Sequence, residues 1–286
     1  MTFDSPQAAA IRLGYGLSPL TPPPPSPEAL LQGIAASTLP GSDGVSIREA
    51  QERGVRLAVL RKEQKRSDAA KKKYQAYNRV CGRLVVRDLQ RRLARAVEDP
   101  TGFGERLVQF WSDHFTIRPD GVQTNALAMA FHDEAIRPHI NGRFEDLFFA
   151  ADTHPMMLVY LNQNTSRGPN SRMARRRAEK AFGLNENLAR EAMELHSLGV
   201  GAPYTQRDVR ELAELMTGLS YSAKDGFSYR PQIAEPGAET VLGKSYGGKG
   251  PGELRDIRAA FRDIARRPET AQFVSRKLAV HFVSDS

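Results

Sequence analysis

Residues 71–97 read KKKYQAYNRVCGRLVVRDLQRRLARAV, and this stretch decides the fold class. It is rich in Arg, Lys, Gln, Ala and Leu, which are among the stronger helix formers. The same composition extends back to about Val45. We therefore expect two long helices over residues 45–98, or one helix that breaks near Ser67-Asp68.

The charge of the chain is concentrated in the same segment. Between Arg48 and Glu98, sixteen Lys and Arg residues stand against six Asp and Glu residues, a balance of +10, whereas the whole chain carries +8. Nucleic acid or another anionic surface could bind such a segment. Over residues 48–95 we favour a solvated helix face, because acidic residues are interspersed and only Tyr74 and Tyr77 could stack on bases.

Helices are also expected on both sides of this segment. Ser5-Pro6 and Ser26-Pro27 each resemble a helix start with proline at the first helical position. Six prolines lie in residues 19–27, which predicts an extended connector. On the C-terminal side, hydrophobic periodicity and start signals predict further helices. Their approximate ranges are 101–115, 122–136, 143–151, 155–161, 206–218, 253–265 and 269–283.

One segment departs from the helical pattern. Residues 227–246 contain FSYRP, EPGAE and TVLG, which predicts a small β-hairpin with its turn at Pro236-Gly237. We therefore expect an all-α, multi-helix globular bundle with a hairpin insertion near 227–246. We expect residues 1–286 to form a single helical domain whose motif-bearing core is 101–221. The last residues, HFVSDS, close no element, which suggests that the chain is truncated at its C-terminus.

Composition excludes several classes of protein. Hydrophobic residues make up 40% of the chain and charged residues 26%, which is typical of a soluble globular protein. No run of eighteen apolar residues is present, so a spanning helix is not expected. Cys81 is the only cysteine, which excludes an internal disulfide framework, and we interpret it as a core residue. The first residues lack a secretory signal. These features predict a cytoplasmic location and leave export open if the chain has been trimmed.

The stretch GLNENLAREAMELHSLGVG, residues 183–201, predicts an acidic helix over 185–199. At about 100° per residue, Asn187, Glu191 and Glu194 share a narrow sector beside an apolar stripe. Two carboxylates at the border of a buried face need a cation, a proton or a basic partner. Acid–base pairs and oxygen-ligand metal sites are built in this way. Pairing with nearby arginines such as Arg190 is the structural alternative.

The central motifs resemble a bacterial family catalogued as domain of unknown function 1800. The resemblance covers nearly the whole chain. It rests on FWSDHFT (110–116), HPMMLVYLN (154–162), GLNENLAREAMELHSLGV (183–200) and YTQRDVRELAELMTGLSY (204–221). It also implies a His-Asp-Pro-Gly type turn where this chain has Ala234-Glu235-Pro236-Gly237, so any role of that histidine is absent here. The family has no established activity, so the resemblance supplies no mechanism.

The candidate site combines the acidic helix with residues of these motifs. Asn187, Glu191 and Glu194 are the candidate catalytic residues, and Glu191 and Glu194 with His114 are the candidate ligands of a divalent metal ion. The candidate substrate-binding residues are Arg190, His154 and Tyr204. A lone histidine on an apolar face is more often a hydrogen-bonded core residue than a ligand. His114 and His154 rank first among the histidines because each lies in a resembling motif.

Three functional hypotheses follow. The first is a metal-binding or hydrolase-like enzyme that uses the carboxylate pair of helix 185–199. The second is a non-catalytic accessory or scaffold protein with a protein partner, in which the acidic helix is a structural polar network. The third and weakest is nucleic-acid binding through residues 48–95.

Overall fold

The computed structural model describes residues 5–40, 44–176 and 183–284. The protein is mostly helical, with two small antiparallel β-hairpins, which confirms the predicted fold class. By internal contacts the chain divides into two compact units, which are described separately: unit 1 is residues 1–142 with 278–286, and unit 2 is residues 143–277. The single-domain organisation stays a prediction. Among the described residues, no helix is both long and apolar enough to cross a membrane.

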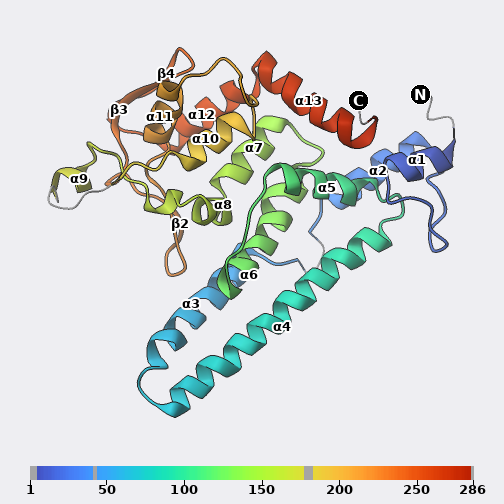
Figure 1. The fold of residues 1–286 in the computed structure, drawn as a ribbon, viewed down its shortest axis with the longest axis horizontal. Helices are drawn as coiled ribbons and strands as arrows, with labels where there is room; N and C mark the ends of the chain where they lie inside the picture. The colour runs from blue at the N-terminus through green and yellow to red at the C-terminus, as the bar shows by residue number, and fades with distance from the viewer. Residues whose placement is uncertain (1–4, 41–43, 177–182, 285–286) are drawn as a thin grey trace. The chain divides into compact units, whose positions relative to one another are not determined.

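Unit 1 is built around a long helical hairpin. Helices α3 (Ile47–Glu63) and α4 (Asp68–Glu98) pack against each other (Figure 1). The predicted break near Ser67-Asp68 is confirmed, because the side chain of Ser67 caps α4 by accepting a hydrogen bond from Ala70 N at 3.1 Å. Arg53 on α3 donates to Asp88 on α4 at 3.0 Å inside the hairpin.

The rest of unit 1 consists of shorter helices. Helices α1 (Pro6–Arg12) and α2 (Pro27–Ser37) begin at the serines predicted to start them, and the proline-rich residues between them are not helical. Helix α5 (Phe103–His114) packs on α2, and α6 (Val122–Ala130) packs on both α3 and α4. The predicted helix 122–136 does not stay α-helical, because it changes to a π-helical turn over Phe131–Ile136 and then to a 3-10 turn over Arg137–His139.

Unit 2 has a helical core that carries the two hairpins. Its helices are α7 (Phe144–Thr153), α8 (Pro155–Tyr160), α9 (Arg172–Arg176), α10 (Asn187–Glu194), α11 (Gln206–Leu215) and α12 (Leu254–Ala265), followed by α13 (Pro268–Phe282), whose last residues belong to unit 1. Phe148 on α7 and Phe261 on α12 are fully buried, with ring centroids 4.5 Å apart. Burial of such large aromatic rings is a main stabilising term for a core.

The β-structure is larger than the sequence predicted. Strand β1 (Leu219–Ser222) pairs with β2 (Gly226–Tyr229), and β3 (Pro236–Val241) pairs with β4 (Lys244–Pro251). The predicted turn at Pro236-Gly237 is wrong, because Pro236 is the first residue of β3, a position that tolerates proline. The turn lies instead at Leu242-Gly243, where both residues have positive φ, 51° and 80°, as a tight two-residue hairpin turn requires.

The acidic helix is shorter than predicted. Helix α10 ends at Glu194 rather than at residue 199. Beyond it, the N–H groups of His196 and Leu198 donate to carbonyls five residues back, both at 2.9 Å. The Ser197 hydroxyl donates to Ala192 O at 2.5 Å, and such side-chain bonds compete with the regular helical ladder. Gly199, with φ of 93°, then turns the chain away.

Candidate anion site

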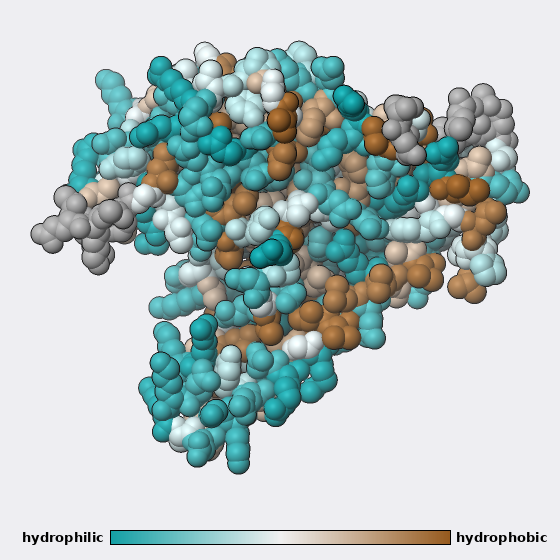
Figure 2. All heavy atoms as spheres, viewed as in Figure 1, coloured by the Kyte–Doolittle hydropathy of each residue, from teal (hydrophilic) through white to brown (hydrophobic). Residues whose placement is uncertain are grey.

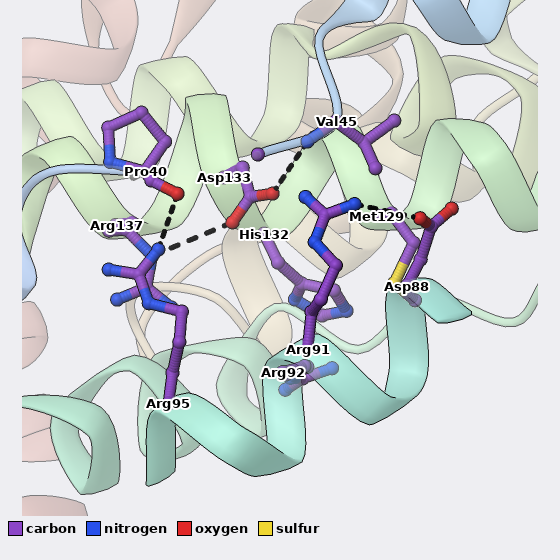
Figure 3. A pocket seen from close by; sticks show the side chains of 11 residues that line it. Pro40, Val45, Asp88, Arg91, Arg92, Arg95, Met129, His132, Asp133 and Arg137 are labelled. Carbon is purple, nitrogen blue, oxygen red and sulfur yellow. Dashed lines mark hydrogen bonds and ion pairs between the residues drawn. The ribbon is translucent and has the colours of Figure 1, made fainter. Parts of the chain in front are cut away.

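A small cavity in unit 1 is lined by four arginines (Figure 3). Its walls come from three stretches of the chain: the residues before α3, the C-terminal third of α4, and the end of α6 with the turns that follow it. The cavity volume is about 20 Å³. The lining residues are Pro40, Gly44, Val45, Asp88, Arg91, Arg92, Arg95, Met129, His132, Asp133 and Arg137.

Helical spacing brings the α4 residues to the cavity. Asp88, Arg91 and Arg95 lie three and four residues apart, so they share one face of the helix. Arg92 lies at the edge of that face and also lines the cavity. The sequence therefore places three guanidinium groups within two turns of one helix.

The opposite wall depends on the π-helical turn Phe131–Ile136. Here the N–H of Arg137 donates to the carbonyl of His132, five residues back. Such turns are rare and are frequent at functional sites. This turn brings His132 and Asp133 to the cavity, and Arg137 follows directly after it.

Most of the arginines have a carboxylate partner. Asp88 accepts from Arg91 at 3.0 Å as well as from Arg53. Glu105, just behind the wall, accepts from Arg137 at 3.0 Å and lies 3.5 Å from Arg95. These pairs hold the side chains of the cavity wall in place.

Asp133 is held by different groups. One carboxylate oxygen accepts from the backbone N–H of Val45 at 3.0 Å, and the other lies 3.6 Å from Nε of Arg137. Burial raises the pKa of Asp133, and its bond to Val45 and the nearby arginines oppose that shift.

Arg92 is the arginine left over. When the ion pairs behind the wall are included, six arginines share four carboxylates. The arginines are Arg53, Arg87, Arg91, Arg92, Arg95 and Arg137, and the carboxylates are Glu49, Asp88, Glu105 and Asp133. Within the described part of the chain, Arg92 makes neither a hydrogen bond nor an ion pair, and no dashed line reaches it in Figure 3. Burial lowers the pKa of Arg92, and Asp113 acts on it only from beyond ion-pair distance.

His132 lines the cavity with an imidazole ring whose orientation is fixed. Its Nδ1 lies 2.8 Å from Ser112 Oγ, and that hydroxyl donates to Val108 O at 2.7 Å. Because the serine hydrogen is directed to Val108, Nδ1 of His132 is the donor in this contact. The contact fixes the orientation of the imidazole and does not activate Ser112 as a nucleophile.

The predicted site residues on α10 lie in unit 2. Glu191 and Glu194 are half-buried, and Asn187 is exposed. Glu194 accepts a hydrogen bond from Tyr204, whose pKa is raised first by burial and then by this carboxylate. The structure therefore brings Glu194 and Tyr204 together.

The arginines near α10 have other partners. Arg190 lies 3.3 Å from a carboxylate oxygen of Glu186 and donates to Gln206 at 2.9 Å. Arg207 and Arg210 pair with Glu211 and Glu214, each at 3.1 Å. The structural alternative from the sequence was an ion pair between Glu191 or Glu194 and one of these arginines. Among the described residues, the ion pairs of these arginines are instead with Glu186, Glu211 and Glu214.

The two motif histidines are buried in different units. His154 caps α8, where its Nδ1 accepts from Met156 N at 3.1 Å, and burial lowers its pKa to about 3. His114 lies in unit 1 against the rings of Phe110, Trp111 and Phe115. Across the described ranges, no group of three or more His, Cys, Asp or Glu side chains is arranged to hold a metal ion. The catalytic, substrate-binding and metal roles predicted from sequence stay predictions.

Sequence reasoning missed both the cavity and a buried pair. Residues 87–95, RDLQRRLAR, were interpreted as a solvated face, although the spacing of Asp88, Arg91 and Arg95 was a signal for a shared face. In unit 2, His196 Nδ1 lies 2.9 Å from Oδ1 of Asp152, and both side chains are buried. These two residues are far apart in sequence, so no local pattern links them.

One comparison identifies a family for this chain. The family described as protein of unknown function (DUF1800) matches residues 9–286. The chain therefore belongs to this family. No curated protein and no solved structure matches it.

Proposed function

We propose that unit 1 binds a small molecule through one anionic group, a carboxylate or a phosphate, in the arginine cavity. The observation that carries this proposal is Arg92, a partly buried guanidinium at the cavity with no counter-ion among the described residues. A buried charge is costly unless it is paired. An anion in the cavity would supply the pair.

The dimensions and donors limit the ligand. A cavity of about 20 Å³ holds little more than one water-sized group, so only one or two oxygens of a carboxylate or phosphate would enter it. Guanidinium groups bind carboxylate and phosphate with two parallel hydrogen bonds. The anionic end of the ligand therefore enters beside Arg92, and the remainder stays outside.

Thermal unfolding of the full chain tests this proposal, with inorganic phosphate and acetate as probes. A ligand at ten times its Kd raises the free energy of unfolding by about 1.4 kcal/mol. We expect Arg92→Gln to abolish this stabilisation. Arg61→Gln, an exposed arginine at the end of α3, is the matched control and should keep it. Two results would refute the cavity as an anion site. One is that the anions stabilise both variants equally, and the other is that neither anion stabilises the unchanged protein.

A second candidate function rests on α10. The carboxylates of Glu191 and Glu194 are neighbours on one helix face, and the nearby arginines pair elsewhere. We propose that this pair acts as an acid–base group or as oxygen ligands of a divalent cation, with Tyr204 orienting Glu194.

Titration with Mn²⁺ or Mg²⁺ separates these roles from a structural one. The double variant Glu191→Gln, Glu194→Gln should lose cation binding at least tenfold, whereas Glu98→Gln, at the exposed end of α4, should not. Unchanged cation affinity in the double variant would remove the metal role. Loss of stability in the double variant, with no cation bound by the unchanged protein, would support a structural polar network.

A further inference from the structure

An apolar stripe on α4 lies exposed. Val86, Leu89, Leu93 and Val97 are between 44% and 68% exposed. Their spacing of three, four and four residues confines them to a sector of about 80° on the helix. Figure 2 shows the corresponding hydrophobic band along α4. We call these four residues the α4 stripe.

The stripe lies on the side of α4 away from the arginine cavity. Asp88, Arg91 and Arg95 face the cavity, and at 100° per residue their sector is centred about 170° from the α4 stripe. The helix thus uses one face to build unit 1 and leaves the other face apolar and uncovered. Exposed, contiguous apolar surface of this kind marks interaction sites.

The C-terminal end of the stripe opens into a groove. Leu93 and Val97 form one wall of a groove of about 380 Å³, and the connector residues Leu17 and Pro22–Pro24 line another part. Because proline fixes φ, this wall loses little conformational freedom when it is covered. An apolar helix face next to a preformed groove is the usual docking geometry for an amphipathic helix.

A row of arginines borders the other end of the stripe. Arg79, Arg83 and Arg87 follow one another at intervals of four residues and are all exposed. Like charges at this spacing on a helix repel each other. Within the described ranges, neither Arg79 nor Arg83 has a hydrogen-bonding or ion-pair partner. Carboxylates on a bound partner would relieve this repulsion.

We propose that the α4 stripe and its arginine row bind an acidic amphipathic helix of another protein. The partner's apolar seam covers the stripe and the groove, and its Asp and Glu side chains pair with Arg79, Arg83 and Arg87. A second copy of this chain that docked through the same segment would fit poorly, because residues 48–98 carry a charge of +10 and would meet the same charge.

Two other anionic surfaces match the stripe less well. Phosphates of nucleic acid would pair with the arginines but would leave the leucine and valine side chains exposed to water. Helices that lie in a membrane surface present a broad face with aromatic residues. The stripe is instead a narrow aliphatic seam with the three-and-four spacing of helix–helix contacts.

The test uses the full chain and two synthetic helical peptides, measured by fluorescence anisotropy. One peptide carries leucines at alternating three- and four-residue spacing, flanked by glutamates, and the other has lysines in place of the glutamates. We expect the glutamate peptide to bind at least tenfold more tightly than the lysine peptide. Leu89→Ser with Leu93→Ser should weaken it at least tenfold.

Charge reversal gives the sharpest control. Arg79→Glu with Arg83→Glu should reverse the preference and favour the lysine peptide, whereas Lys71→Glu, exposed near the start of α4, should leave it unchanged. Equal binding of both peptides, or no effect of the leucine changes, would overturn the proposal. So would stripe-dependent binding to phosphatidylserine vesicles or to duplex DNA, or stripe-dependent dimerisation in sedimentation, without peptide binding.

Discussion

The buried pair of Asp152 and His196 is a single contact on which the stability of unit 2 should depend. Asp152 is fully buried, and burial raises its pKa while His196 opposes that shift. Removing one partner of a buried pair leaves the other uncompensated, at a cost of about 3–5 kcal/mol. We therefore expect His196→Leu to lower the free energy of unfolding by roughly this amount in urea denaturation.

The neutral double variant is the control for this prediction. Asp152→Asn with His196→Gln keeps two polar groups that can bond to each other and removes the carboxylate. It should be more stable than His196→Leu alone. If His196→Leu is the more stable of the two, Asp152 does not depend on His196 for its compensation.

Glu239 should make the stability of the fold fall as the pH rises, whereas a glutamate with a lowered pKa makes stability fall as the pH drops. It is buried near Glu211, Glu214 and Glu235, and burial, followed by these carboxylates, raises its pKa to about 8. The folded chain therefore holds a proton that the unfolded chain releases at its ordinary pKa of 4.5. This contribution to stability is complete below that value and is lost as the pH rises through about 8.

Replacing Glu239 with glutamine should remove this dependence, because glutamine resembles the protonated side chain. We expect Glu239→Gln to be more stable than the unchanged protein at pH 8.5, by roughly 1–3 kcal/mol, and similar to it at pH 4.5. Urea denaturation at both pH values measures the difference. A variant equally destabilised at both would show that Glu239 is ionised in the folded protein.

At the scale of elements, the sequence predicted where helices begin better than where they end. Ser5 and Ser26 begin α1 and α2 as expected, because a cap is a local signal of a few residues. The end of α10 depends on Ser197 bonding to Ala192 O and on Gly199, and hydrophobic periodicity continues past it. The Pro236-Gly237 dipeptide misled the hairpin prediction because a β-strand can begin with proline.

The N-terminal cap of α4 is a local contact whose loss should be measurable as a change in stability. Ser67→Ala removes the acceptor for Ala70 N and should lower the free energy of unfolding by about 1 kcal/mol. Ser67→Asp keeps an acceptor and should stay near the unchanged value. Equal losses in the two variants would mean that the hydroxyl is needed for something other than capping.

At the scale of the whole molecule, the fold class was predictable and the cavity was not. Helix formers and caps act within one segment, so composition and spacing sufficed for a mostly helical protein. The cavity gathers residues near 40–45, 88–95 and 129–137, and only tertiary packing brings these together. The π-helical turn that presents His132 leaves no trace in a 3.6-residue pattern.

The two opposite faces of α4 have a thermodynamic consequence. An anion bound at the arginine face and a partner helix bound at the stripe would both contact α4, a single helix of 31 residues. If occupancy of one face changes the affinity of the other, linkage requires the effect to be reciprocal and equal in both directions. Measuring peptide affinity with and without phosphate would therefore also give the change in phosphate affinity that the peptide causes.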